Sequence, residues 1–128
     1  MDAIARQPKI KAGSRRRATN AVARGRAKSE LQMLAAQAAT AARMLKLLGN
    51  ENRLLVLCAL VVRGEMKVGD LVKEVGLSQS AMSQHLALLR ADGLIAFRRE
   101  AQTLYYRVSD PRAARILKLL KDIYCGDL

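Results

Sequence analysis

The sequence predicts a mainly α-helical domain that carries one small β-hairpin near its C-terminal end. Two observations support this fold class. Apolar side chains recur every three or four residues through much of residues 29–91 and again after residue 111, which is typical of helices that bury one face. Between these segments, residues 94–108 change to a two-residue period rich in β-branched and aromatic side chains, which is typical of strands.

Two helices are expected first. Helical spacing of apolar residues begins after Ser29, a good capping residue, and the helix that they form ends at Gly49. Asn50 caps a second helix, which continues to about Val62 and is apolar nearly all round. A helix of that kind lies buried at the centre of a domain.

A short helix and a longer one then follow, separated by a turn. The short helix spans residues 68–75, and Gly76 supplies the turn. Ser78 caps the next helix, which continues to about Ala91 and stops at Gly93.

A hairpin and a last helix complete the order. Residues 94–99 and 103–108 are the two strands, and residues 100–102 connect them. Asp110 caps the last helix, which has Pro111 at its first position. The apolar stripe of this helix contains Ile116, Leu117, Leu120, Ile123 and Tyr124.

The helix over residues 78–91 offers small polar side chains to a partner. At about 100° per residue, its apolar residues fall on one side and its polar residues on the other. The polar side holds Gln79, Ser80, Ser83 and Gln84. Ser and Gln can read base edges in a DNA groove, and a recognition helix meets the bases near its N-terminus. The alternative is an ordinary solvated face, although such faces usually carry Glu and Lys. His85, the single histidine, falls towards the apolar side, so we expect it to be packed rather than to act as a ligand or catalyst.

The charge of the chain favours a polyanionic partner. Lys and Arg number 23 against 11 Asp and Glu, a net charge of +12. Residues 1–30 carry nine basic and two acidic residues, or +7, so we expect residues 1–28 to form a flexible basic arm, with some helix formed by its alanines as the alternative. In the hairpin, Arg98, Arg99 and the tip residue Gln102 suit contact with backbone phosphate or the minor groove. The alternative is a solvated hairpin that only covers the core.

Several classes of protein are disfavoured. The longest apolar run, Leu54–Val62, has nine residues, whereas a spanning helix needs about 20. No apolar segment follows the basic N-terminus, so we expect a cytoplasmic protein, with an organellar transit peptide as the alternative. An enzyme, such as a thiol oxidoreductase, is not expected, because there is no CxxC, no glycine-rich phosphate loop and no nucleophile paired with a base. No cofactor is expected.

Three segments resemble the ArsR/SmtB family of bacterial winged-helix repressors. They are GNENRLLVL (49–57), VGDLVKEVGLSQSAMSQHLALLRADGLI (68–95) and REAQTLYYRV (99–108). The resemblance covers about Leu45 to Cys125. It implies a winged helix-turn-helix fold and a homodimer joined through the first and last helices. Residues 29–128 would then form the DNA-binding and dimerisation domain, and two recognition helices would meet a near-palindromic operator. A non-specific architectural DNA-binding protein remains the alternative.

The sequence departs from the metal-sensing patterns of that family. One pattern uses a cysteine pair in the third helix, where this chain has Lys67-Val68-Gly69-Asp70-Leu71. Another uses His and carboxylates on the last helix, where residues 111–128 contain no histidine. We therefore expect no metal site, and a metal-responsive repressor is kept as an alternative.

The two cysteines resemble those of the thiol-sensing branch, the sulfide- and persulfide-responsive repressors of the biofilm growth-associated type. In that branch one cysteine lies in the second helix and one near the end of the last, as Cys58 and Cys125 do here. The resemblance implies that oxidants or reactive sulfur species link the two thiols and release DNA. The alternative is that Cys58 is only a small buried hydrophobic residue.

Overall fold

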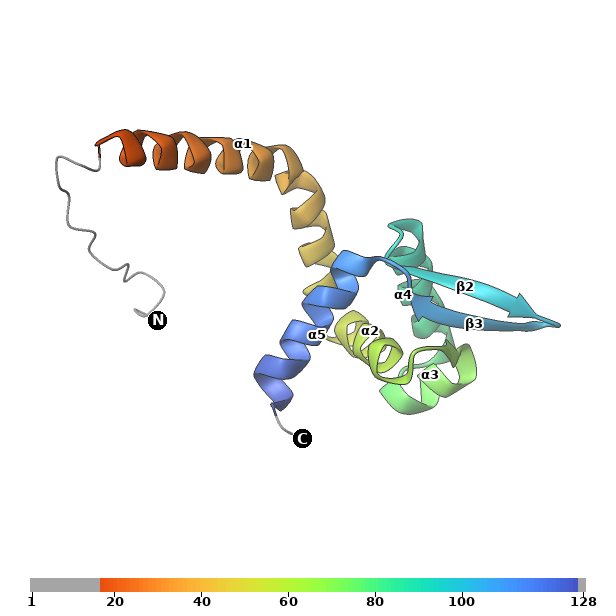
Figure 1. The fold of residues 1–128 in the computed structure, drawn as a ribbon. Coiled ribbons are helices and arrows are strands. Elements are labelled where there is room, and N and C mark those ends of the chain that lie inside the picture. The colour runs from red at the N-terminus through yellow and green to blue at the C-terminus, as the bar shows by residue number, and fades with distance from the viewer. Residues whose placement is uncertain (1–16, 127–128) are drawn as a thin grey trace. The chain divides into compact units, whose positions relative to one another are not determined.

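The computed structural model of the protein describes residues 17–126 (Figure 1). The elements are α1 (Arg17–Leu48), α2 (Glu51–Arg63), β1 (Met66–Lys67), α3 (Val68–Val75), α4 (Gln79–Ala91), β2 (Ile95–Glu100), β3 (Thr103–Val108) and α5 (Pro111–Cys125). This mainly helical order with a small sheet confirms the predicted fold class, a winged helix-turn-helix. The chain divides into two units, Met1–Thr40 and Ala41–Leu128. In the described part, no helix is both long and apolar enough to cross a membrane.

Three of the predicted helix starts are confirmed by their capping bonds. Side-chain oxygens of Asn50, Ser78 and Asp110 accept a backbone N–H from the first turn of α2, α4 and α5, at 3.0, 3.1 and 2.8 Å. Each bond satisfies a donor that the helix itself leaves unpaired. The turn between α3 and α4 is made at Gly76, whose φ of 81° lies in the left-handed region that glycine adopts freely.

The first helix begins earlier than the sequence predicts. Ser29 was expected to cap it, but the helix is continuous from Arg17 and Ser29 lies within it. Residues 17–28 contain four alanines and no proline, so helix propensity favours a helix even without apolar periodicity. The flexible arm expected over residues 1–28 is therefore helical over residues 17–28, and residues 1–16 lie outside the described part.

A third strand joins the hairpin. β1 pairs antiparallel with β3, which gives the sheet order β1-β3-β2. The sequence predicted two strands, because a strand of two residues is too short to show a period. β2 begins and ends one residue later than predicted, so the turn consists of Ala101 and Gln102 only. β2, β3 and this turn, residues 95–108, are called the wing below.

The core of the second unit lies between α2, α4, α5 and the sheet. Val56, Leu57 and Leu60 of α2 are at most 1% exposed, as expected for a central helix. The prediction that α2 is buried all round is wrong, since Leu55 and Val62 are 47% and 61% exposed. The remaining core residues include Met44, Leu47, Leu48, Met66, Leu71, Met82, Leu86, Leu89, Leu94, Ile95, Tyr106, Ala113 and Leu117.

Candidate DNA interface and thiol pair

The polar face of α4 is exposed as the sequence predicts. α4 buries Met82, Leu86 and Leu89 against the core. The exposed side chains include all four predicted DNA readers, Gln79, Ser80, Ser83 and Gln84. His85 is half-buried, on the packed side of the helix where it was expected. The Ser78 cap holds the first turn, so the first readers stand on an ordered N-terminus.

The register of the wing places its two neighbouring arginines on opposite faces. In β2, Phe97 pairs with Tyr106, while Arg98 pairs with Tyr105 and Arg99 with Leu104. Paired residues in an antiparallel ladder project to the same face, and successive residues alternate. Phe97 and Arg99 therefore share the inner face, on which buried Tyr106 packs towards the helices, and Arg98 shares the outer face with Tyr105.

Arg98 is engaged by other groups of the protein. Its Nε donates to both carboxylate oxygens of Glu65, at 3.1 and 3.0 Å, and its Nη1 donates to Glu100 at 2.7 Å. The guanidinium carbon lies 4.4 Å from the centre of the Tyr105 ring. The carboxylates of Glu65 and Glu100 raise the pKa of Arg98 above its already high usual value. By contrast, Arg99 is exposed and forms no ion pair within residues 17–126.

The wing tip lies beside two lysines that the sequence analysis did not select. Lys67, Lys73 and Gln102 line a hollow of about 460 Å³ with the first residues of α3. Gln102 was predicted at the tip of the hairpin, and it lies in the turn. Lys67 lines this hollow because β1 pairs with β3, and no local sequence pattern predicts that pairing.

The two cysteines lie on helices that pack against each other. Cys58 is half-buried on α2, and Cys125 is exposed at the end of α5, which packs against α2. Both thiols are free. Burial raises the pKa of Cys58, and the charge of the Cys125 thiolate raises it further.

An apolar hollow also borders Cys58. Its volume is about 280 Å³, and its walls come from α2 and α3. The lining residues are Leu55, Cys58, Ala59, Val62, Arg63, Glu74 and Val75. Within residues 17–126 there is no group of three or more His, Cys, Asp and Glu that could hold a metal ion.

Comparisons with known proteins agree with this architecture. A family model described as a bacterial regulatory protein of the arsR family matches residues 50–96. The transcriptional activator HlyU of Vibrio cholerae is 45% identical over 95 residues, which span 74% of this chain and 87% of HlyU. The transcriptional regulator YgaV of Escherichia coli is 41% identical over 97 residues, spanning 76% of this chain and 98% of YgaV.

Solved structures show the same fold. The transcriptional repressor BigR of Xylella fastidiosa matches with a TM-score of 0.68 at 34% identity, over 73% of this chain and 95% of BigR. HlyU of Vibrio vulnificus matches with a TM-score of 0.69 at 45% identity, over 75% of this chain and 99% of that protein. These relatives are transcriptional regulators rather than enzymes, and the family binds DNA and generally acts as dimers. The resemblance seen in the sequence is confirmed, and the chain belongs to the ArsR family of bacterial transcriptional regulators.

Proposed function

We propose that this protein is a dimeric transcriptional repressor whose affinity for a near-palindromic operator falls when Cys58 and Cys125 become linked. The observation that carries this proposal is the pair of free thiols, far apart in the sequence, on two helices that pack against each other, α2 and α5. Both helices belong to the unit that holds the helix-turn-helix, so a bond between them acts on the DNA-binding body itself.

Operator reading is assigned to α4 and the wing. Gln79, Ser80, Ser83 and Gln84 are exposed on α4, and their amide and hydroxyl groups suit base edges in the major groove. Arg99 and Gln102 of the wing, with Lys67 and Lys73 beside the tip, suit the phosphate backbone. Arg98, also selected from the sequence, differs from these side chains because Glu65 and Glu100 engage its guanidinium.

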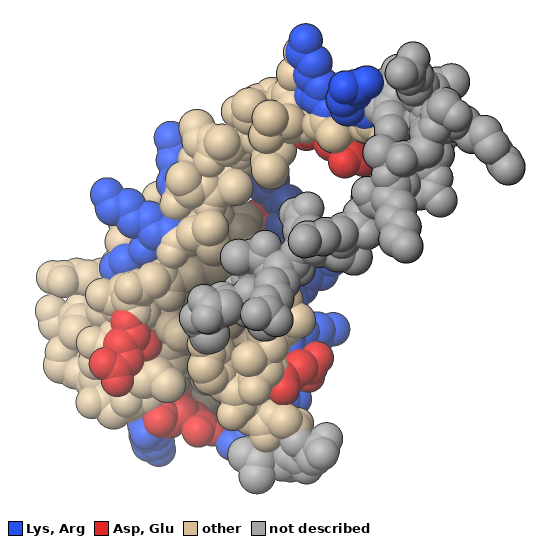
Figure 2. All heavy atoms as spheres, turned by 90° about the vertical axis from the view of Figure 1, so that its left-hand side faces the viewer, with Lys and Arg blue, Asp and Glu red and all other residues tan. Residues whose placement is uncertain are grey.

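A second copy of the chain is proposed to cover the apolar surface of α5. Leu119, Ile123 and Tyr124 are 58%, 61% and 81% exposed, and Leu45 of α1 is 57% exposed. Figure 2 views the left-hand side of Figure 1, and uncharged side chains make up much of the surface drawn there. Exposed apolar surface of this kind usually marks a contact with another protein, and a symmetric dimer supplies the second recognition helix.

The proposed linking reaction is a two-electron oxidation of the thiols. The exposed Cys125 thiolate attacks the sulfane sulfur of an organic persulfide, which releases the organic thiol and leaves a persulfide on Cys125. Cys58 then attacks the inner sulfur of that persulfide, forming the Cys58–Cys125 disulfide and releasing H₂S. The raised pKa of Cys58 favours Cys125 as the first nucleophile, since the thiolate is the reactive form.

Two relatives agree with parts of this proposal, since one is a repressor and the other has a solved structure in a reduced form. The biofilm growth-associated repressor of Xylella fastidiosa is 36% identical over 85 residues, which span 66% of this chain and 74% of that repressor. A solved structure of Vibrio cholerae HlyU is described as reduced, and it matches with a TM-score of 0.69 at 45% identity.

Operator binding of reduced and persulfide-treated protein tests the proposal. We expect treated protein to bind the operator at least about tenfold more weakly, a coupling of about 1.4 kcal/mol. Cys58→Ser and Cys125→Ser should bind like reduced protein before treatment and should not form the bridge. Mass spectrometry reports whether the two thiols are joined and by how many sulfurs. Equal affinity of bridged and reduced protein would refute the switch.

A non-specific architectural role is the second candidate, favoured by the charge of +7 on residues 1–30. Deleting residues 1–28 separates the two. If the shortened protein still prefers the operator over random DNA, the basic segment only adds phosphate contacts. If the shortened protein loses the preference, the arm determines DNA binding.

A further inference from the structure

We propose that Arg98 positions the wing, rather than binding DNA, by tying it to the segment between α2 and β1. This inference rests on the proposed DNA interface and is independent of the thiol switch. Its basis is an ion-pair arrangement in which Arg63, at the end of α2, reaches α3, and Glu65, two residues later, reaches the wing.

The outer face of the wing engages two of the three nitrogens of the Arg98 guanidinium. Nε and Nη1 are taken up by Glu65 and Glu100, and the Tyr105 ring covers the flat side of the group. A phosphate contact made by the remaining N–H groups of Arg98 would bring the carboxylates of Glu65 and Glu100 close to the DNA backbone, where they would be repelled. Arg98 is thus better suited to an intramolecular role than its position beside Arg99 suggests.

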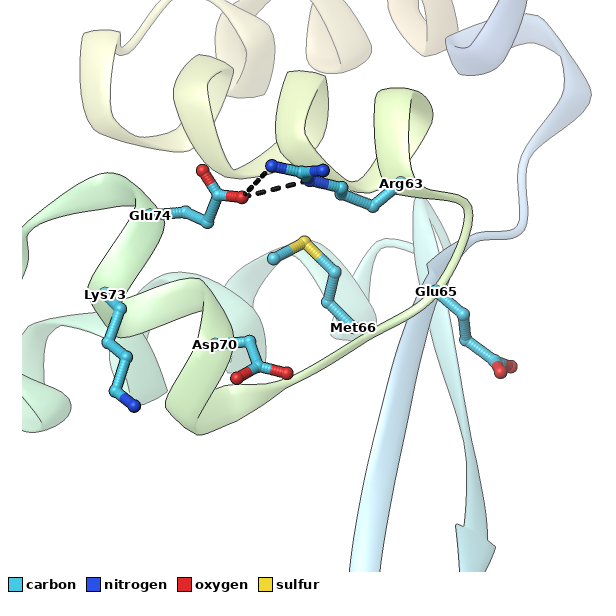
Figure 3. A pocket seen from close by; sticks show the side chains of 6 residues that line it. All are labelled: Arg63, Glu65, Met66, Asp70, Lys73 and Glu74. Carbon is cyan, nitrogen blue, oxygen red and sulfur yellow. Dashed lines mark hydrogen bonds and ion pairs between the residues drawn. The ribbon is translucent and has the colours of Figure 1, made fainter.

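The partner of Arg98 belongs to a short segment held at two points. Arg63, the last residue of α2, donates to Oε1 of Glu74 in α3, from Nε at 3.0 Å and from Nη2 at 2.6 Å. Gly64 follows with a φ of 86°, and Glu65 then pairs with Arg98. Figure 3 shows Arg63 and Glu74 meeting near Met66, while Glu65 points away from that pair. The segment therefore connects the first helix of the helix-turn-helix with the wing.

The inner face of the wing is held independently. The guanidinium carbon of Arg90, in the last turn of α4, lies 4.2 Å from the centre of the Phe97 ring. Phe97 in turn packs edge-on against Tyr106 at 5.5 Å between ring centres. Arg90 thus contacts the inner face of β2, and Arg98 holds the outer face to the neighbouring segment. Arg99 forms no ion pair among the described residues, so its guanidinium can bind a phosphate.

Salt dependence separates a positioning residue from a phosphate contact. Loss of one phosphate contact lowers the slope of log affinity against log salt by about 0.9. We expect reduced, full-length Arg98→Met to bind the operator about fivefold more weakly with an unchanged slope. The matched control, Arg99→Met on the opposite face, should lower the slope by about 0.9.

The direction in which operator affinity changes when Glu65 is substituted distinguishes the two roles of Arg98. If Arg98 positions the wing through Glu65, Glu65→Gln weakens operator binding. Adding Arg98→Met then weakens it further only by the share of the Glu100 and Tyr105 contacts, because the Glu65–Arg98 contact is already lost. If Arg98 binds phosphate, Glu65→Gln frees the guanidinium and removes a negative charge, so affinity rises. A rise in affinity, or a slope reduced in Arg98→Met, would overturn the proposal.

Amide hydrogen exchange tests, without DNA, whether the Glu65–Arg98 contact holds the wing in place, an arrangement called the clamp. Both Arg98→Met and Glu65→Gln should speed exchange in β2 and β3 several-fold and leave α4 unchanged. Unchanged exchange in the wing would refute the clamp whatever the DNA result. If wild-type protein fails to select any operator while exchange responds as expected, the proposed function fails and the clamp stands.

Discussion

Ser78 caps the N-terminal turn of α4, which carries the proposed base readers Gln79 and Ser80. Replacing Ser78 by alanine should therefore weaken operator binding. In the folded protein, Ser78 Oγ accepts the backbone N–H of Ala81 at 3.1 Å. Ser78→Ala leaves that donor to solvent at the start of the helix. Loss of such a cap costs about 1 kcal/mol of helix stability. The cost falls on the turn that carries Gln79 and Ser80.

The expected effect on binding follows from that magnitude. About 1 kcal/mol corresponds to about a fivefold change in an equilibrium constant. If binding requires an ordered first turn, operator affinity should fall about fivefold, and affinity for random DNA should fall less because phosphate contacts do not depend on Gln79 and Ser80. Urea unfolding should show a loss of about 1 kcal/mol in the free energy of unfolding.

Asn50→Ala is the matched control. Asn50 caps α2 through an equivalent bond to Arg53 N–H at 3.0 Å, but α2 carries none of the proposed base readers. It should lower the free energy of unfolding by a similar amount and leave the preference for operator over random DNA unchanged. Ser78→Thr, which keeps the hydroxyl, should restore most of both properties. The reasoning would be refuted if Asn50→Ala and Ser78→Ala reduced the preference equally.

Three further outcomes are expected. Leu57→Ala, at a side chain with no exposure, should lower the free energy of unfolding by about 2–5 kcal/mol in urea, and Leu55→Ala, at a side chain that is 47% exposed, by much less. Burial and Cys125 raise the pKa of Cys58, so the alkylation rate of this thiol should still be rising above about pH 8.5, and a rate that levels off at about pH 8.5 would contradict this. The free energy of unfolding should fall as the pH rises from about 8.5 through the raised pKa, because the buried thiol is favoured in its neutral form. The hydrogen bond from Arg112 lowers the pKa of Asp110, so the ionised carboxylate stabilises the fold above about pH 4, and this stabilisation is lost as the pH falls through the lowered pKa. Asp110→Asn, which keeps a capping oxygen, should remove this part of the acid dependence of unfolding.

The recognition helix was predictable because its signals are local. A capping serine, a stopping glycine and a helical period lie within one stretch of sequence, and each acts through residues at most four positions away. The same period assigned Met82, Leu86 and Leu89 to the core and the Ser and Gln side chains to the surface, as found.

The parts that depend on distant pairing were missed or only partly seen. β1 exists because Met66 pairs with Tyr106, forty residues later, and two residues show no alternation of their own. The sequence predicted one shared role for Arg98 and Arg99, because only the third strand brings Glu65 to the outer face beside Arg98. The start of α1 was missed for another reason, because a helix whose side chains are exposed has propensity but no burial pattern.

The size of the proposed switch limits how it can work. A linked pair of cysteines on α2 and α5 can influence the wing through Arg63, the last residue of α2, and through Glu65, two residues later in the segment before β1. Exposed ion pairs of this kind are individually weak and screened by salt, so this connection can adjust the wing but cannot account for a coupling of 1–3 kcal/mol alone. We expect the larger share to come from the proposed dimer. If α5, which carries Leu119 and Ile123, forms the dimer contact, a small rotation of this helix would change the spacing of both recognition helices at once. We therefore expect Arg98→Met to lower operator affinity in the reduced and linked states by the same factor, leaving the ratio between the states unchanged. If the ratio collapsed instead, the wing connection would be the route of the switch rather than a separate support of the DNA interface.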